Sequence, residues 1–262
     1  MFNDHRFRDR MHLSGVNSIN WGRIMAQIVY FFTTAVSLGA PHRPVSFTVP
    51  TGNFGDIFAG YAAMRMGLPI ERLVIATNDN DILARTLDTG IYEMRGVVQT
   101  TSPSMDIQIS SNFERLLFEA AGRDAAAVRT MMAGLAQSGQ FSIETKALQA
   151  IRDLFSAGRS DMAETAETIR SVLASDNYLA DPHTAVALAV ARRQSASQTP
   201  MIVLSTAHPA KFPDAVKTAS GVDPALPPFL SDLMSRQEKF SVLPSRLEMV
   251  QRHIEGHIRV AQ

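Results

Sequence analysis

The sequence has no cysteine among its 262 residues. This absence excludes disulfide bonds, zinc sites built from thiolates and catalysis by a cysteine nucleophile, and it fits a cytoplasmic location. Net charge is absent too, because 25 basic residues balance 25 acidic ones. A neutral chain produces no overall field that would favour nucleic acid or an anionic membrane as a partner. With 45% hydrophobic and 19% charged residues, the composition is typical of an ordinary globular protein.

The sequence also lacks a hydrophobic run long enough to suggest a membrane anchor. Its most apolar segment, 24–41, carries no charge, but it is short for a membrane span and contains a glutamine, two threonines and a serine. Ser18 or Asn20 is suited to cap a helix that starts here, and the Gly-Ala-Pro sequence at 39–41 is suited to end it. We therefore interpret the segment as a buried helix of the domain.

Short apolar segments alternate with longer segments of helical pattern. Strands are predicted at 45–49, 73–77, 97–99, 141–143 and 201–205. Helices are predicted at 20–38, 56–66, 79–88, 111–121, 124–137, 144–157, 162–174, 183–194, 209–219, 226–236 and 244–259. Strands that are apolar throughout and separated by helices form parallel sheets covered on both faces. We thus predict an α/β fold with a mostly parallel sheet, as a single domain over 1–262 whose residues 226–262 form a helical tail.

Three polar loops follow predicted strands. They are Thr-Gly-Asn-Phe-Gly-Asp at 51–56, Asn-Asp-Asn-Asp at 78–81 and Ser-Thr-Ala-His-Pro-Ala-Lys-Phe at 205–212. In open parallel sheets, ligands bind outside the carboxyl ends of the strands, which lie at one edge. The three loops are therefore predicted to line one site.

The loop at 51–56 is suited to bind a phosphate group. It matches neither the P-loop, which needs a Lys-Ser/Thr pair, nor the dinucleotide motif GxGxxG. Gly52 and Gly55 permit backbone conformations that other residues avoid, and the start of the next helix attracts anions. Asn53 adds a donor, whereas Asp56 is expected to cap the helix or fix the loop. A capped turn without a ligand remains the alternative.

The loop at 205–212 is ambiguous when taken alone. Its Ser-Thr pair can offer a hydroxyl to a ligand, and His208 can act as a base. However, a histidine at a helix start is commonly structural, and Lys211 in a first helical turn is commonly solvated. This loop becomes informative only together with the rest of the chain.

Six segments of the chain together resemble the threonine synthase family. They are "VNSINWGRIMAQIVYFF", "PTGNFGDIFAGYAAMRMGLPI", "ATNDNDILART", "SPSMDIQISSNFERLLFE", "DPHTAVALAV" and "STAHPAKFPDAV". They occur in the family's order, between about residue 3 and residue 240. The resemblance implies a pyridoxal-phosphate enzyme of the tryptophan-synthase-β fold, or fold type II. Such enzymes are lyases that convert O-phospho-L-homoserine and water into L-threonine and phosphate, the last step of threonine biosynthesis.

The resemblance also implies which residues hold the cofactor and the substrate, and it implies no metal. It assigns the phosphate of pyridoxal 5′-phosphate to Gly52, Asn53, Phe54, Gly55 and Asp56. Thr206 matches the residue whose hydroxyl meets the pyridine nitrogen. It assigns the substrate phosphate to Ser18, Asn20 and Arg23, since arginine is suited to bidentate phosphate contacts. The alternative is that Ser18 and Asn20 cap the next helix while Arg23 is solvated.

The sequence departs from the family at the catalytic lysine. The family carries its Schiff-base lysine in a Ser-Phe-Lys-Asp-like segment in the first half of the protein, whereas the lysines here, at 146, 211, 217 and 239, lie in other contexts. We therefore predict a carboxy-terminal portion of a larger two-domain enzyme, with no catalytic residue of its own and the lysine upstream. The expected partners are O-phosphohomoserine and the missing amino-terminal portion. Alone, the chain is expected to be inactive.

Two other functions remain open. A related phospho-lyase of the same fold would release a 2-oxo acid instead of threonine. A non-catalytic module that binds a phosphate compound or a partner chain is favoured only by the missing lysine. Neither alternative requires nucleic acid or a membrane.

Overall fold

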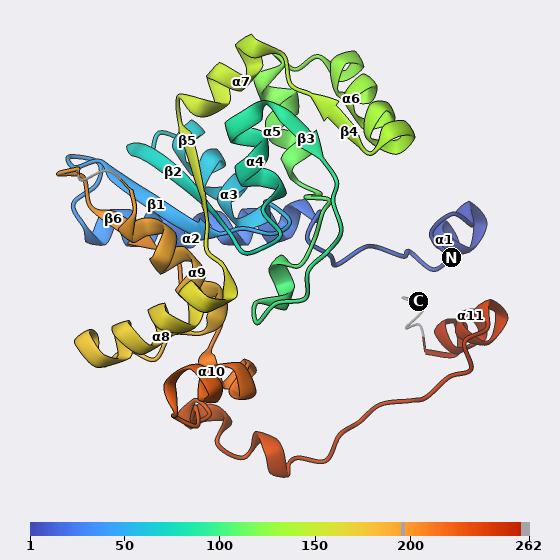
Figure 1. The fold of residues 1–262 in the computed structure, drawn as a ribbon. Helices are drawn as coiled ribbons and strands as arrows, with labels where there is room; N and C mark the ends of the chain where they lie inside the picture. The colour runs from blue at the N-terminus through green and yellow to red at the C-terminus, as the bar shows by residue number, and fades with distance from the viewer. Residues whose placement is uncertain (195–196, 258–262) are drawn as a thin grey trace. The chain divides into compact units, whose positions relative to one another are not determined.

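The computed structural model describes residues 1–194 and 197–257. The chain forms two compact units (Figure 1). The larger unit spans Ser18–Ala225, and the smaller unit combines Met1–Asn17 with Leu226–Gln262. The prediction of one domain over 1–262 with a tail at 226–262 stays a prediction.

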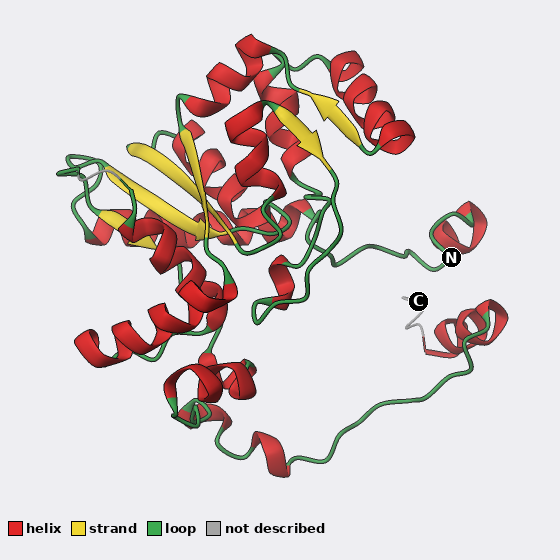
Figure 2. Cartoon of the chain, in the orientation of Figure 1, coloured by secondary structure: helices red, strands yellow, loops and turns green. Residues whose placement is uncertain are grey.

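A four-stranded parallel sheet forms the centre of the larger unit (Figure 2). Its order is β5 (Phe155–Arg159), β2 (Ile70–Thr77), β1 (Val45–Pro50) and β6 (Met201–Val203). All three neighbouring pairs are parallel, and Phe47 of β1 lies opposite Leu73 of β2. The predicted α/β class with a mostly parallel sheet is therefore confirmed. A separate antiparallel pair joins β3 (Ile91–Glu93) to β4 (Gln140–Ser142).

Helices cover both faces of the sheet because the strands are apolar on both sides. On one face, Leu73 and Ile75 belong to the main core with side chains of α2 (Trp21–Ser37), α3 (Gly55–Arg65) and α4 (Ile82–Thr89). On the other face, Val74 packs with Val186 and Val190 of α9 (Pro182–Arg192). Burying one such side chain contributes about 1.5–3 kcal/mol, so both layers hold the strands in register.

Most of the remaining helices follow the predicted order, but the helix at His5–Arg10 and the 3-10 turn at Pro103–Met105 were not predicted. In the larger unit they are η1 (Pro103–Met105), α5 (Phe113–Ala120), α6 (Ala125–Ser138), α7 (Thr145–Arg152), α8 (Met162–Asp176), η2 (Pro209–Lys211) and α10 (Pro213–Ser220). In the smaller unit they are α1 (His5–Arg10), η3 (Pro228–Leu230), η4 (Leu233–Ser235) and α11 (Leu247–His257). An ion pair between Arg10 and Glu255 joins α1 to α11. Residues 226–236, predicted as one helix, form only the two short 3-10 turns.

Two further secondary-structure predictions are wrong. Residues 97–99 form no strand, because the side chain of Asn80 takes up both hydrogen-bonding groups of the Val98 backbone. Its Oδ1 accepts from the Val98 N–H at 2.9 Å, and its amide donates to the Val98 carbonyl at 2.8 Å. The helix predicted over 144–157 ends at Arg152, and Phe155–Arg159 pair with β2 as a strand. The spacing of apolar residues continues the helical pattern beyond Arg152, but hydrogen bonding to the backbone of β2 makes residues 155–159 a strand.

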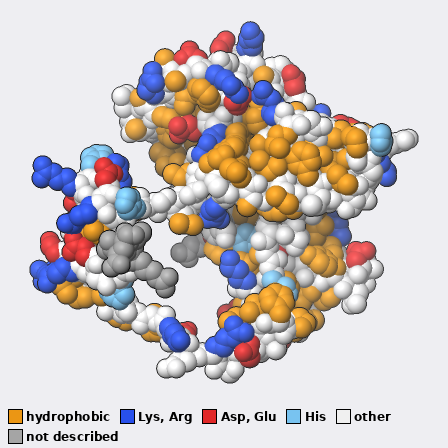
Figure 3. All heavy atoms as spheres, turned by 180° about the vertical axis from the view of Figure 1, so that it is seen from behind, with side chains coloured by type: hydrophobic (Ala, Val, Ile, Leu, Met, Phe, Trp, Pro, Cys, Tyr) orange, Lys and Arg blue, Asp and Glu red, His pale blue; other side chains and the backbone are white. Residues whose placement is uncertain are grey.

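Residues 24–37 of the apolar segment lie in α2, which buries only one side. Ile24, Phe31 and Ala35 are buried against the core, whereas Met25 and Val29 are more than half exposed. Figure 3 shows the resulting gathering of hydrophobic side chains on one face of the molecule. None of the helices in the described part of the chain is long and apolar enough to cross a membrane.

Candidate functional site

The loop that joins β1 to α3 lies at the carboxyl edge of the sheet. Phe54, directly before the helix, has φ 62° and ψ 7°, a left-handed conformation that costs a non-glycine residue roughly 1–2 kcal/mol. Its ring is 1% exposed and packs against Phe113 and Phe155, with ring centroids 5.2 and 5.8 Å apart. Core packing therefore holds the loop in an unfavourable backbone conformation, a feature that clusters at functional sites.

The first turn of α3 has no side-chain cap among the described residues. Its leading N–H groups are thus open to a ligand, and the helix end carries a partial positive charge that attracts anions. Asp56 does not cap the helix, contrary to one of the two roles expected for it. Its Oδ1 instead accepts a hydrogen bond from the hydroxyl of Tyr30 in α2 at 2.8 Å.

Two cavities of about 160 Å³ each adjoin this loop. On the same measure a single water molecule needs roughly 10–15 Å³, so each has room for a phosphate-sized group. The first cavity is lined by Ser18, Arg23, Gln27 and residues 50–57. The second is lined by Pro50, Gly52, Asp56, Ser104, Met105, His183, Thr206, Ala207, Lys211 and Phe212. Pro50, Gly52 and Asp56 therefore separate the two cavities.

The structure brings together all of the predicted site residues except Asn20. Those of the loop line the first cavity with Ser18 and Arg23, and Thr206 lines the second. The side chain of Asn20 caps α2, accepting from the Gly22 N–H at 2.8 Å, as the alternative interpretation had it. The roles assigned to the individual residues stay predictions.

The carboxyl group of Asp56 is the electrostatic feature that both cavities share. Burial raises the pKa of Asp56 from 3.8 to about 6, and the hydrogen bond from Tyr30 opposes that rise. Burial, and next the charge of Asp56, raise the pKa of Tyr30, so its hydroxyl stays a donor. An anion bound at the loop would raise the pKa of Asp56 further, because like charges disfavour ionisation.

A Ser-Ser-Asn segment before α5, which sequence reasoning missed, clamps the loop. The Asn112 amide donates to the carbonyl oxygens of Asn53 and Ser18, both at 2.9 Å. The Ser110 hydroxyl donates to the Gly52 carbonyl at 2.7 Å. The signal was a run of polar residues at the start of the helix predicted over 111–121, which in fact begins only at Phe113. The clamp holds the loop through its carbonyl groups, so it does not use the N–H groups at the start of α3.

Asp181 and His183 at the start of α9 are a second feature that was missed. His183 lines the second cavity, with Nδ1 3.2 Å from Asp181 Oδ1 and Nε2 accepting from the Ser104 N–H at 3.3 Å. The sequence signal was an aspartate before a proline, the pattern of a helix N-cap. That pattern predicts the cap but not a cavity residue.

The loop at 78–81 does not reach either cavity, so the prediction that three loops line one site is wrong for it. Asn78 and Asn80 both donate to Oδ1 of Asp106, at 2.7 and 3.0 Å. These bonds tie the loop to the segment that leads into Ser104 and Met105. The loop therefore supports the second cavity indirectly.

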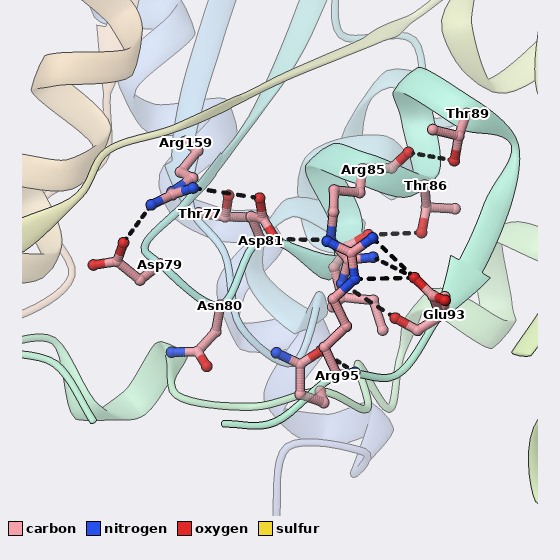
Figure 4. Close-up of polar contacts among 12 residues, drawn as sticks. Thr77, Asp79, Asn80, Asp81, Arg85, Thr86, Thr89, Glu93, Arg95 and Arg159 are labelled. Atoms are coloured by element: carbon pink, nitrogen blue, oxygen red, sulfur yellow. Dashed lines mark hydrogen bonds and ion pairs between the residues drawn. The ribbon is translucent and has the colours of Figure 1, made fainter. Parts of the chain in front are cut away.

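The two aspartates of this loop form ion pairs instead of a ligand site. Figure 4 shows Asp79 facing Arg159, with 2.6 Å between Oδ1 and Nη2, and Asp81 facing Arg85, with 2.8 Å between Oδ1 and Nε. Arg85 also approaches Glu93 at 3.5 Å. Within the described ranges, no group of three or more His, Asp or Glu side chains is placed to hold a metal ion.

The loop at 205–212 does reach the site. Thr206 and Lys211 line the second cavity, and both residues are exposed. His208 is structural, because its Nδ1 accepts from the Ala210 N–H at 3.2 Å and caps η2.

Comparisons with known proteins point to one family. Residues 184–254 match the family model described as threonine synthase, C-terminal. The chain is 50% identical over 259 residues to the threonine synthase of Pseudomonas aeruginosa and 41% identical over 274 residues to that of Saccharomyces cerevisiae. These alignments cover 98% and 96% of this chain but 55% and 53% of the relatives. The chain therefore spans about half the length of the relatives that it matches.

Solved structures give the same result in three dimensions. A PLP-bound threonine synthase from Brucella melitensis superimposes with a TM-score of 0.96 and 68% identity, over 99% of this chain and 56% of that one. The yeast threonine synthase superimposes with a TM-score of 0.85 and 40% identity, over 97% and 55%.

Proposed function

Since the chain belongs to the threonine synthase family, we propose that it is the carboxy-terminal portion of such an enzyme and supplies the phosphate-binding and ring-binding parts of its pyridoxal 5′-phosphate site. One observation carries this proposal: the clamped loop at 51–56 opens an uncapped helix between two cavities, and Thr206 stands on the wall of one of them.

The residues present fit this cofactor. The N–H groups at the start of α3 suit its phosphate. A Cβ atom on Gly52 would lie 2.7 Å from the Ser104 carbonyl oxygen, so only glycine permits the close approach of the two segments. The Thr206 hydroxyl would form a hydrogen bond with the pyridine nitrogen and, unlike a carboxylate, would not keep that nitrogen protonated. When bound, the cofactor supplies an electron sink for the amino-acid substrate.

The side of the first cavity that Ser18 and Arg23 line, across from the loop at 51–56, is the proposed site for the phosphate of O-phospho-L-homoserine. Arg23 brings a guanidinium group suited to a phosphate, and Ser18 brings a hydroxyl whose Oγ lies 3.4 Å from Ser111 Oγ. Asn20 would not take part, because its side chain caps α2. Asp56, between the two cavities, would lie beside both phosphate groups.

The Schiff-base lysine would come from the remainder of the enzyme. Lys211 lines the second cavity but lies outside a Ser-Phe-Lys-Asp-like context, and Lys217 pairs with Asp223 at 2.9 Å. Without the family's lysine, the chain would bind the cofactor but would not catalyse the conversion of phosphohomoserine to threonine.

Exposed apolar surface supports the remainder of the enzyme as partner. On α2, side chains four and seven residues apart point outward and are 46–59% exposed: Trp21, Met25, Val29 and Val36 (Figure 3). A further cavity of about 880 Å³ beside Trp21 is lined by Ile109 and Phe118 among others. Surfaces of this kind mark protein–protein contacts.

Binding of pyridoxal 5′-phosphate to the 262-residue chain, measured by equilibrium dialysis, tests the proposal. We expect binding that inorganic phosphate competes away and that Gly52→Ala abolishes. Gly96→Ala is the matched control, because a Cβ atom there meets nothing within 4 Å. Equal binding by the two variants would contradict the proposed site.

Activity requires the full-length enzyme, and product analysis with O-phospho-L-homoserine decides its class. Release of threonine and phosphate supports a synthase. Release of a 2-oxo acid would support the related phospho-lyase.

A further inference from the structure

His183 is held between two partners and has one defined tautomer. Its side chain is 5% exposed. The Ser104 N–H donates to Nε2 at 3.3 Å, so Nε2 carries no proton. The proton therefore lies on Nδ1, which donates to Asp181 Oδ1 at 3.2 Å.

Asp181 is a fixed anchor for this ring. The carboxylate is 1% exposed and accepts from the backbone N–H groups of His183, at 2.9 Å, and Thr184, at 3.4 Å. The Thr184 hydroxyl donates to its other oxygen. Since these bonds cap α9, the helix sets the position of the carboxylate. A carboxylate that is hydrogen-bonded to one ring nitrogen fixes the tautomer and the orientation of an imidazole ring.

Ser104 is the residue that His183 reaches, and it forms the wall opposite Gly52. Its N–H is bound by His183, while its carbonyl oxygen is the atom that a Cβ on Gly52 would meet at 2.7 Å. One residue, through the N–H and the carbonyl on either side of its Cα atom, thus connects the imidazole to the glycine of the candidate phosphate loop. A shift of Ser104 would move the cavity wall.

We propose that Asp181 and His183 form a brace that holds Ser104 against Gly52 and thereby sets the width of the second cavity. In the proposed function, on which the consequence for the cofactor rests, this cavity takes the ring of pyridoxal 5′-phosphate. His183 is then a positioning residue, because it acts through Ser104.

Two substitutions separate the two hydrogen bonds of the ring. In His183→Gln, the terminal oxygen reaches the place of Nε2 and can accept from Ser104. In His183→Asn, the shorter amide reaches only the place of Nδ1 and can donate to Asp181. Both lose the ring that lies on Phe212, with centroids 4.7 Å apart, so they form a matched pair.

Hydrogen exchange of the Ser104 amide tests the brace without any ligand. We expect the amide to exchange about tenfold faster in His183→Asn than in the unmodified chain, whereas His183→Gln keeps most of the protection. Equal protection in both variants would overturn the brace. A ¹⁵N spectrum that places the imidazole proton on Nε2 would do the same.

Pyridoxal 5′-phosphate binding tests the consequence for the cavity. We expect the dissociation constant to rise about tenfold in His183→Asn and to stay within about twofold in His183→Gln. Equal affinities would overturn the role in cofactor binding and leave the proposed function standing. Absence of binding even to the unmodified chain would contradict the proposed function, and the Ser104 exchange rates would still decide the brace.

Discussion

The hydroxyl of Tyr30 donates to Oδ1 of Asp56 at 2.8 Å, which joins the middle of α2 to the first turn of α3. This contact connects a helix that borders the first cavity to the carboxyl group that both cavities share. Tyr30→Phe removes the donor, and because a hydrogen bond to the ionised form lowers a carboxyl pKa, we expect the pKa of Asp56 to rise above 6. A ¹³C NMR titration of the carboxyl carbon measures it.

Tyr178→Phe is the control for this prediction. Tyr178 is similarly exposed, and its hydroxyl lies 3.1 Å from Ser205 Oγ, so its loss should leave the Asp56 titration unchanged. An unaltered pKa in Tyr30→Phe would show that the hydrogen bond does not act on the carboxylate.

The raised pKa of Asp56 predicts how stability depends on pH. The folded chain binds this proton more tightly than the unfolded chain, so the contribution is fully present below pH 3.8 and is lost as pH rises to about 6. Above pH 6 the ionised carboxylate lowers stability by on the order of 3 kcal/mol relative to a neutral group. Asp56→Asn should thus gain more stability over the unmodified chain at pH 7 than at pH 4. Urea unfolding at both pH values measures the gain, and an equal gain would contradict the assignment.

Because Phe54 is in the left-handed conformation, we expect glycine to be more stable than alanine at this position. Both substitutions remove the contacts with Phe113 and Phe155, which lowers the free energy of unfolding by about 3–5 kcal/mol. Glycine adopts φ 62° without the steric cost that alanine pays. We therefore expect Phe54→Gly to be more stable than Phe54→Ala by about 1 kcal/mol in denaturant unfolding. Greater stability of the alanine variant would show that residue 54 leaves the left-handed region.

Arg23 predicts a substrate effect in the full-length enzyme. If its guanidinium binds the phosphate of O-phospho-L-homoserine, Arg23→Ala should raise KM about tenfold or more, because a charged hydrogen bond is lost. Steady-state kinetics measures this. Arg43→Ala, which removes an exposed arginine outside both cavities, should leave KM unchanged. An unchanged KM in Arg23→Ala would show that Arg23 does not bind the substrate phosphate and is only solvated.

Local patterns accounted for those parts of the fold and site that depend on neighbours along the chain. An apolar β-branched run, a glycine-bearing loop and a helical run placed β1, the loop at 51–56 and α3 correctly. The side chain of Asn20 was also identified as a helix cap, although a ligand role was predicted beside it. These features follow from backbone preferences and capping, which act over a few residues.

Contacts between distant residues decided the rest, because hydrogen bonds and close packing across the fold are not encoded in local spacing. Phe155–Arg159 became a strand only through pairing with β2, and Asn80 kept residues 97–99 out of the sheet. The sequence alone predicted a loop at 51–56 that is suited to bind phosphate. That Thr206 and His183 stand around one cavity beside it follows from the parallel sheet, which brings residues more than a hundred positions away to the same edge.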